Sequence, residues 1–405
     1  MDNPLPWRVT LPWYSNCDPF MKKLIWLAAF LAVCSCGGKK TDPDPPTPDP
    51  TPSVVETPPF AKGADISWAS EMEAGGRTFR KKDGTSAPLL DVLHEGGFNA
   101  IRLRVWVDPY KGWSGPADVE AVAKKVSAAG LALMVDFHYS DFFADPSRQK
   151  APSAWEKDKA DADKVAALVT THTREVLQAL KAAGVTVNWV QIGNETRGGM
   201  VYPAGQLDYD NEGKEFLGFV KLFNAGYAAA KAVYPSALVM PHLNNAFDSP
   251  ANTWWLSNFK SQGGKFDAIA LSHYPHYESK LWIGGKETVL TPAQVNQYAL
   301  QDIADLAGTF KVPVIVSEVG VKPKQSDAAS ILSSFLTESR KFSSCKGVFY
   351  WEPEVDGNWK PALYSDLAAL TRYSGSTQTR AWNAYDQGAF TANGAPSAIL
   401  DCFGE

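Results

Sequence analysis

The chain has 405 residues, of which 45% are hydrophobic and 20% charged, and its formal net charge is −5. This composition is typical of a globular protein, and mild acidity without a basic run argues against a nucleic-acid partner. Roughly 345 residues remain once a signal and linker region is set aside, which suits one α/β barrel domain and predicts a monomer.

Residues 21–36 resemble a bacterial lipoprotein signal peptide. A charged start at Met21 precedes an apolar run, Leu24–Val33, that is too short to span a bilayer. Cys36 follows the small residue Ser35 and is the expected lipidation site. Residues 1–20 have no place in such a signal, so we interpret them as an over-extended start. The signal predicts a lipid-anchored protein of the bacterial cell envelope, on the outer membrane, facing the cell surface or the periplasm.

Residues 37–59 repeat proline and aspartate and contain few apolar side chains. Such a segment cannot bury a core and is expected to be an extended linker. The single catalytic domain is therefore predicted to span residues 60–405.

From residue 60 onward, amphipathic segments alternate with β-rich runs. Helices are expected at 89–97, 119–130, 172–184 and 216–234. Eight runs read as buried strands, at 63–67, 98–109, 131–141, 185–195, 235–245, 263–275, 311–320 and 345–353. This alternation predicts a closed (β/α)8 TIM barrel. An open doubly wound sheet is the alternative, but no glycine-rich phosphate loop follows the first strand.

Nearly every predicted strand ends in polar or aromatic residues, which gather at one rim of a barrel and predict the active site there. They are Asp65, Arg104, Trp106, Asp136, His138, Asn194, Glu195, His242, His273, Tyr274, Glu318, Trp351 and Glu352.

Two of these strand ends carry glutamates after uncharged runs, Glu195 and Glu318. A pair of carboxyl groups is what glycoside hydrolysis needs, one protonating the leaving oxygen and one attacking the sugar. We assign Glu195 as acid/base and Glu318 as nucleophile. Asn194 is expected to bind the sugar 2-hydroxyl. Arg104 either orients the nucleophile or forms an ordinary ion pair at the rim.

Histidines end three different strands, at His138, His242 and His273, which is also a pattern of catalytic zinc. Each has its own aromatic neighbours, so donors to sugar hydroxyls are the favoured interpretation. Cys345 and Cys402 are the cysteines of the predicted domain, and either a disulfide or two separate buried thiols fits an exported protein.

Four segments resemble glycoside hydrolase family 53, the endo-β-1,4-galactanases that act on pectin side chains. They are Ile101–Pro109, Asp136–Trp155, Gln191–Thr196 and Phe349–Pro353. The resemblance implies a (β/α)8 barrel and a retaining mechanism, with the same roles for Glu195 and Glu318. It places Arg104, His138, Asn194 and Trp351 around the sugar next to the scissile bond, with Trp351 as stacking platform.

The expected substrate-binding set is Asp65, Arg104, Trp106, His138, Asn194, His242, His273, Tyr274 and Trp351. No cofactor is required. Some family members hold calcium after the seventh or eighth strand, and Asp356 and Asp366 are weak candidates here. The expected partner is β-1,4-galactan, and the expected activity is its endo-hydrolysis. A mannanase or xylanase of the same clan, or a non-catalytic glycan-binding lipoprotein, are the alternatives.

Overall fold

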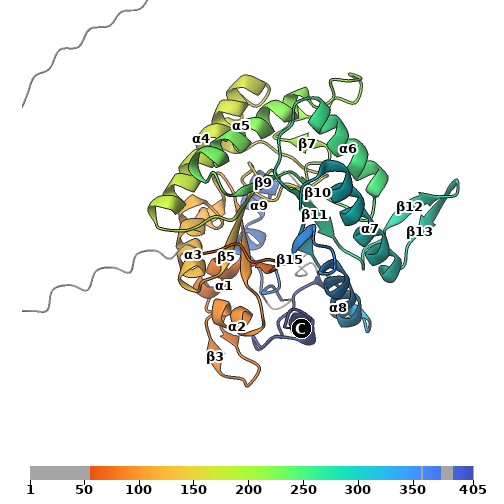
Figure 1. The fold of residues 1–405 in the computed structure, drawn as a ribbon. Helices are drawn as coiled ribbons and strands as arrows, with labels where there is room; N and C mark the ends of the chain where they lie inside the picture. Colours follow the sequence, from red (N-terminus) through yellow and green to blue (C-terminus); the bar gives the residue numbers. More distant parts are fainter. Residues whose placement is uncertain (1–54, 357–358, 375–385, 405) are drawn as a thin grey trace, which may run out of the picture. The chain divides into compact units, whose positions relative to one another are not determined.

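Parallel strands close into a barrel with helices around it in the computed structural model (Figure 1). The structure describes residues 55–356, 359–374 and 386–404. The chain divides into two units, Met1–Thr51 and Pro52–Glu405, and the barrel belongs to the second. The over-extended start, the signal peptide with Cys36, and residues 37–54 of the linker lie outside the described residues.

The main sheet runs in the order β10-β11-β14-β15-β1-β4-β5-β6-β9, and neighbouring strands in it pair in parallel. Its strands are β1 (Ala61–Asp65), β4 (Ala100–Val105), β5 (Ala132–Phe137), β6 (Trp189–Ile192), β9 (Leu238–Met240), β10 (His242–Leu243), β11 (Ile269–His273), β14 (Val314–Val319) and β15 (Cys345–Trp351).

The two ends of this sheet are parts of one strand. Only Pro241 separates β9 from β10, and proline has no N–H to donate to a ladder. Its carbonyl still accepts from the Ala270 N–H at 2.9 Å, so β9 pairs with β6 on one side while β10 pairs with β11 on the other. Nine strand segments therefore make eight strand positions, and the predicted (β/α)8 barrel is confirmed.

Helices surround the strands (Figure 1) and cover their outer faces. They are α1 (Ala69–Ala74), α2 (Leu89–Glu95), α3 (Pro116–Ala128), α4 (Ala162–Ala182), α5 (Leu217–Val233), α6 (Ser249–Ser261), α7 (Pro292–Phe310), α8 (Ala328–Ser339), α9 (Leu367–Ser374) and α10 (Ala398–Asp401). Three small hairpins are β2 (Phe79–Arg80) with β3 (Ser86–Ala87), β7 (Gly199–Met200) with β8 (Gly205–Gln206), and β12 (Lys280–Ile283) with β13 (Lys286–Val289).

Helix α4 begins ten residues before the predicted start at residue 172. The side chain of Asp161 caps it by accepting from the backbone N–H groups of Asp163 and Lys164 at 3.1 and 3.2 Å. None of the described helices is long and apolar enough to cross a membrane.

The amino-terminal half of the barrel interior is an apolar plug. It consists of Ala61, Ala100, Ala132, Met134, Trp189, Met240, Ala268, Ala270, Ile315 and Phe349, all almost fully buried. The Trp189 and Phe349 rings meet edge to face, with centroids 5.8 Å apart. Gly63 leaves room for Phe349, since a Cβ there would lie 2.0 Å from that ring. This end of the barrel is a packed core and offers no site.

Cys345 and Cys402 are two separate buried thiols, so the disulfide alternative is wrong for this structure. The Cys345 thiol lies 4.0 Å from the carbonyl oxygen of Gly347, and the Cys402 thiol lies 3.4 Å from that of Ala329. The two thiols therefore have different hydrogen-bond partners.

Candidate active site

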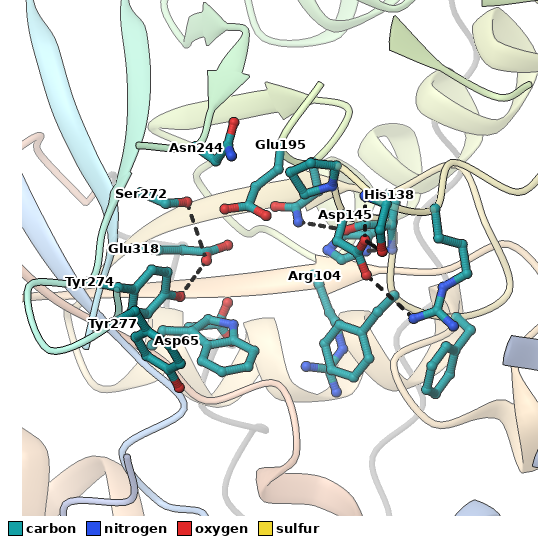
Figure 2. Close-up of a pocket in the computed structure, with 18 of the residues that line it drawn as sticks. Asp65, Arg104, His138, Asp145, Glu195, Asn244, Ser272, Tyr274, Tyr277 and Glu318 are labelled. Atoms are coloured by element: carbon teal, nitrogen blue, oxygen red, sulfur yellow. Dashed lines mark hydrogen bonds and ion pairs between the residues drawn. The ribbon is translucent and has the colours of Figure 1, made fainter. Parts of the chain in front are cut away.

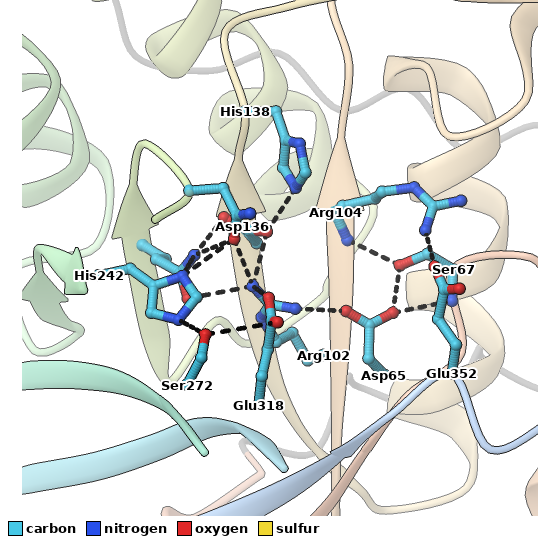
Figure 3. Close-up of polar contacts among 12 residues, drawn as sticks. Asp65, Ser67, Arg102, Arg104, Asp136, His138, His242, Ser272, Glu318 and Glu352 are labelled. Atoms are coloured by element: carbon cyan, nitrogen blue, oxygen red, sulfur yellow. Dashed lines mark hydrogen bonds and ion pairs between the residues drawn. The ribbon is translucent and has the colours of Figure 1, made fainter. Parts of the chain in front are cut away.

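The barrel interior becomes polar toward the carboxyl ends of the same strands. Side chains two residues apart share a face of a strand, so Arg102 and Arg104 follow Ala100 into the interior, and Asp136 follows Met134. These charged groups are buried, with Arg102 and Arg104 each 1% exposed. They are joined by ion pairs and hydrogen bonds (Figure 3). Buried charges are tolerated only when paired, so this layer is built as one network.

A cleft of about 1450 Å³ opens above this layer (Figure 2). The predicted site residues that line it are Asp65, Arg104, His138, Asn194, Glu195, Tyr274, Glu318 and Trp351. Trp106, His242 and His273 do not line it.

Glu318 reaches the interior because of a β-bulge. Ile315 lies in the apolar plug, so strict alternation would turn Ser317 inward and Glu318 outward. However, β11 and β14 change register between Leu271 and Ser272, so that Ser272 pairs with Glu318 and Ser317 is skipped. A bulge re-aims the side chains that follow it. The bulge therefore delivers the carboxylate to the cleft.

The Glu318 carboxylate is held by three partners. Arg102 forms an ion pair with one oxygen at 2.9 Å, and the Tyr274 hydroxyl donates to the other at 2.6 Å. The Ser272 hydroxyl lies 3.4 Å from that second oxygen. Burial raises the pKa of Glu318, while Arg102 and the Tyr274 hydrogen bond oppose the rise. Both opposing partners favour the ionised form.

Arg102 also anchors the neighbouring acids and was missed in the sequence analysis. Its guanidinium pairs with Asp65 at 2.6 Å and with Asp136 at 2.8 Å, in addition to Glu318. Burial alone would raise the pKa of Asp136, but Arg102 and His138 outweigh it and lower that pKa. One buried cation thus fixes three carboxylates.

Glu195 faces Glu318 across the cleft (Figure 2). Gly193 makes the turn after β6, with φ +77° and no room for a Cβ, which would lie 2.5 Å from Thr196. Glu195 itself has φ +47°, an uncommon conformation that recurs at functional sites. At least one oxygen of Glu195 lies within 4.8 Å of an oxygen of Glu318.

The surroundings of the two carboxyl groups favour a proton on Glu195. Burial, followed by the negative charge of Glu318, raises the pKa of Glu195 to about 8. Arg102 and Tyr274 contact Glu318 directly, so Glu318 is the better carboxyl to ionise. The arrangement favours one protonated and one ionised carboxyl group near neutral pH, a combination that glycoside hydrolysis uses.

His242 and Asn194 lie in the buried polar layer and contact the residues around this carboxyl pair. His242 is fully buried and contacts the Glu195 N–H at 3.3 Å, the Asn194 side-chain oxygen at 2.9 Å and the Ser272 hydroxyl at 2.8 Å. Asn194 accepts from Arg102 at 3.0 Å and donates to the Ala144 carbonyl at 2.8 Å. His242 is therefore placed to position other groups and does not reach the cleft.

The comparisons with known proteins agree with this geometry. The model of glycosyl hydrolase family 53 matches residues 61–344. The chain belongs to this family. It is thus a glycoside hydrolase.

Among its relatives is an arabinogalactan endo-β-1,4-galactanase of Thermothelomyces thermophilus, 29% identical over 78% of this chain and 96% of the relative. An endo-β-1,4-galactanase of Bacillus subtilis is 29% identical over 73% of this chain and 70% of the relative. An uncharacterized protein of Niallia circulans is 37% identical over 55% of this chain but only 61% of that protein.

Solved structures share the fold. A structure from a study of two fungal β-1,4-galactanases has a TM-score of 0.68 and 25% identity, covering 85% of this chain and 99% of its own. The family 53 catalytic domain of Ignisphaera aggregans has a TM-score of 0.70 and 24% identity, covering 88% and 98%.

In this family 53 chain, Arg104 does not orient the nucleophile. Its guanidinium pairs with Glu352 and lies over the Trp68 and Trp106 rings, 4.1 and 4.4 Å from their centroids. Burial raises the pKa of Glu352 to about 8, and Arg104 opposes the rise. The ion pair at the rim is the correct alternative, and Trp106 is a buried wall behind it rather than a sugar contact.

His273 points away from the cleft, because Ala270 and Ser272 occupy the inward positions of β11. Its ring stacks on Phe335 of α8 at 4.1 Å, and its Nε2 lies 2.7 Å from the Asn296 side-chain oxygen. The prediction that it binds substrate is therefore wrong. Because His273 points away from the cleft, His138, His242 and His273 do not converge on one zinc site.

His138 is oriented for donation toward Asp136. Its Nδ1 accepts from the Ala144 N–H at 3.0 Å, so a ring proton lies on Nε2, 2.9 Å from Asp136.

The two calcium candidates have other partners in the structure. Asp356 pairs with Arg77. Asp366 accepts from the Tyr110 hydroxyl at 3.2 Å and from the Ala369 N–H at 3.0 Å. In the described part of the chain, neither belongs to a group of three metal-ligating side chains.

Proposed function

We propose that this family 53 chain is a retaining endo-β-1,4-galactanase that hydrolyses β-1,4-galactan to galacto-oligosaccharides by double displacement. The observation that carries the proposal is the approach of the Glu195 and Glu318 oxygens to within 4.8 Å. Retaining enzymes place their carboxyl groups about 5 to 5.5 Å apart, whereas inverting enzymes need about 6.5 to 9.5 Å to admit a water. The substrate follows from relatives named as β-1,4-galactanases.

In the first step, Glu318 attacks the anomeric carbon and forms an ester bond to it, while the bond to the leaving oxygen breaks. Glu195 gives its proton to that oxygen. In the second step, water forms a bond to the anomeric carbon, the ester bond to Glu318 breaks, and Glu195 takes the proton of the water. Both carboxyl groups return to their starting states.

The rest of the cleft supports binding of a polymer. Its volume of about 1450 Å³ exceeds the roughly 300 to 1,000 Å³ of ordinary small-molecule sites. Trp351 lies at the cleft with Phe143 and Tyr274 edge-on to it, both at centroid distances of 6.2 Å. We assign it as the platform for the sugar beside the scissile bond, with Asp65, Arg104, His138 and Asn194 as polar contacts. This arrangement favours internal cleavage.

From the sequence we further propose that residues 21–36 are a lipoprotein signal, that Cys36 is lipidated, and that the enzyme works as a monomer at the bacterial envelope. The two displacement steps use only the carboxyl groups of Glu195 and Glu318 and a water molecule, so the proposed mechanism requires no cofactor. Mass spectrometry of the membrane-extracted protein tests this, because lipidation adds acyl mass to a peptide beginning at Cys36.

The activity is tested by hydrolysis of β-1,4-galactan, measured by reducing ends and product sizes. Wild type is expected to release oligosaccharides, and Glu195→Ala and Glu318→Ala are each expected to lose at least about 10³-fold in kcat. Glu175→Ala, on the exposed surface of α4, is the control that keeps full activity. Activity on mannan or xylan but not galactan would overturn the substrate. Galactan binding without hydrolysis would make the chain a binding protein.

A further inference from the structure

Ser272 interacts with both carboxyl groups of the pair. Its side chain is buried, 1% exposed, and faces inward from β11. The hydroxyl oxygen lies 2.8 Å from His242 Nε2 and 3.4 Å from a Glu318 oxygen. A hydrogen bond from Ser272 also lowers the pKa of Glu195. Figure 3 shows the contacts of Ser272 with His242 and Glu318. One hydroxyl therefore acts on both members of the pair.

The tautomer of His242 decides where the Ser272 proton points. A backbone N–H can only donate, so the Glu195 N–H at 3.3 Å makes His242 Nδ1 an acceptor. The Asn194 side-chain oxygen lies 2.9 Å from the same Nδ1, but it already accepts from Arg102 at 3.0 Å and from Gln191 at 3.1 Å. The Gln191 side-chain nitrogen donates to Asp136 at 2.6 Å, which fixes the orientation of the amide group. The same nitrogen lies 2.9 Å from His242 Nδ1. The buried ring is neutral, since burial, and then Arg102, lower its pKa. Its proton consequently lies on Nε2 and is donated to the Ser272 oxygen.

With its oxygen accepting from His242, the Ser272 hydroxyl keeps its own proton for a carboxylate. Two carboxylates lie within reach, but a hydroxyl has one proton to donate. We infer that Ser272 is a positioning residue whose hydroxyl proton follows the negative charge from Glu318 to Glu195 during double displacement. This inference rests on the proposed function.

The charge moves once in each half of the reaction. Glu318 is ionised at the start, and its charge is lost when its oxygen bonds to the anomeric carbon. Glu195 becomes ionised in that same step, because its proton leaves with the departing oxygen. Rotation of one O–H bond redirects the Ser272 hydrogen bond to Glu195, which then acts as base toward water. The second step reverses both changes.

The other charged and titratable groups around the pair keep fixed partners, whereas the Ser272 hydroxyl can rotate. Arg102 from β4 and Tyr274 after β11 contact Glu318. Asp65 from β1 and Asp136 from β5 are bound to Arg102. Arg102 also lowers the pKa of Glu195 by its positive charge, and the negative charge of Asp145 raises it.

The experiment compares Ser272→Ala with Tyr274→Phe in pH profiles of kcat/KM on galactan. In the free enzyme Glu318 carries the charge, so loss of either hydroxyl raises the pKa of Glu318 and both variants should move the acid limb of kcat/KM to higher pH. In the glycosyl-enzyme the charge is on Glu195, so Ser272→Ala alone should also move the acid limb of kcat to higher pH for a substrate whose turnover is limited by hydrolysis of that intermediate. A shift confined to kcat/KM in Ser272→Ala, or no shift in either profile, would overturn the inference.

A second measurement uses a dinitrophenyl β-galactobioside, whose leaving group needs no acid. Hydrolysis of the glycosyl-enzyme then limits turnover, and Ser272→Ala is expected to keep the burst of dinitrophenol while its steady-state rate falls about 10-fold. Ser272→Thr, which retains a hydroxyl, is expected to recover most of that rate. An unchanged steady-state rate in Ser272→Ala would overturn the inference. Wild-type inactivity on galactan would instead overturn the proposed function, so the two failures are distinguishable.

Discussion

The two halves of the barrel interior use the same strands for opposite purposes. The amino-terminal half is filled by apolar side chains such as Trp189 and Phe349, which need no partners beyond close packing. The carboxyl-terminal half holds Arg102 with three carboxylates, which are stable only as a network. Burial is nearly complete in both. The difference shows that this fold obtains stability from one layer and supports chemistry on the next, two residues along each strand.

Removing the cation of the polar layer should have the largest effect. Arg102→Met leaves Asp65, Asp136 and Glu318 without their shared partner, so we expect the free energy of unfolding to fall by about 3 to 5 kcal/mol. We also expect kcat on galactan to fall at least about 10³-fold, since the nucleophile loses its orientation. Urea denaturation and steady-state kinetics measure the two effects. Arg104→Met is the matched comparison, and an equal loss of kcat there would contradict the special role of Arg102.

Opening the apolar layer should affect stability alone. Trp189→Ala removes a fully buried ring and is expected to lower the free energy of unfolding by about 3 to 5 kcal/mol. The Glu195 and Glu318 contacts are left in place, so kcat/KM measured well below the melting temperature should change little. A large loss of kcat/KM in protein shown to be folded by circular dichroism would break the separation between the layers.

The polar layer also predicts a bell-shaped pH dependence of kcat/KM. Glu195 must be protonated to act as acid, so activity is lost as pH rises through its pKa of about 8. Glu318 must be ionised to attack, so activity is also lost as pH falls through its raised pKa. With an activated aryl galactoside, Glu195→Gln should abolish the alkaline limb. A limb that persists in that variant belongs to another group.

The smallest effect is expected at His273, which lies outside the interior altogether. His273→Gln should leave KM for galactan unchanged and lower the free energy of unfolding by about 1 to 2 kcal/mol. Burial lowers the pKa of His273 to about 4, so its neutral form is favoured in the fold. Stability is therefore lost as pH falls below the usual histidine pKa, and Gln should reduce this acid sensitivity in melting curves. A raised KM would return His273 to the binding site.

The sequence was sufficient for the strands and for the carboxyl pair, because strong β-branched runs ending in Glu195 and Glu318 carry both signals. Alternation along a strand was an unused signal. It places Arg102 in the same inward row as Arg104, and it turns His273 outward once Ser272 faces in. Both errors came from judging residues by nearness to the strand end.

Other features had no signal in the sequence alone. Strict alternation from Ile315 would have selected Ser317, and only the pairing of β14 with β11 reveals the bulge that turns Glu318 inward. The partner of Arg104 is Glu352, which is far along the chain and meets Arg104 only when the barrel closes. Register and closure are properties of the assembled sheet, so these contacts require the structure.

The most direct test of the paired-carboxyl account is the anomeric configuration of the first product, followed by proton NMR during hydrolysis of a galacto-oligosaccharide. Carboxyl oxygens within 4.8 Å leave Glu318 to attack the sugar itself, so two displacements should release the β-anomer before mutarotation. Initial release of the α-anomer would mean a single displacement by water and would contradict the assignment of Glu318 as nucleophile.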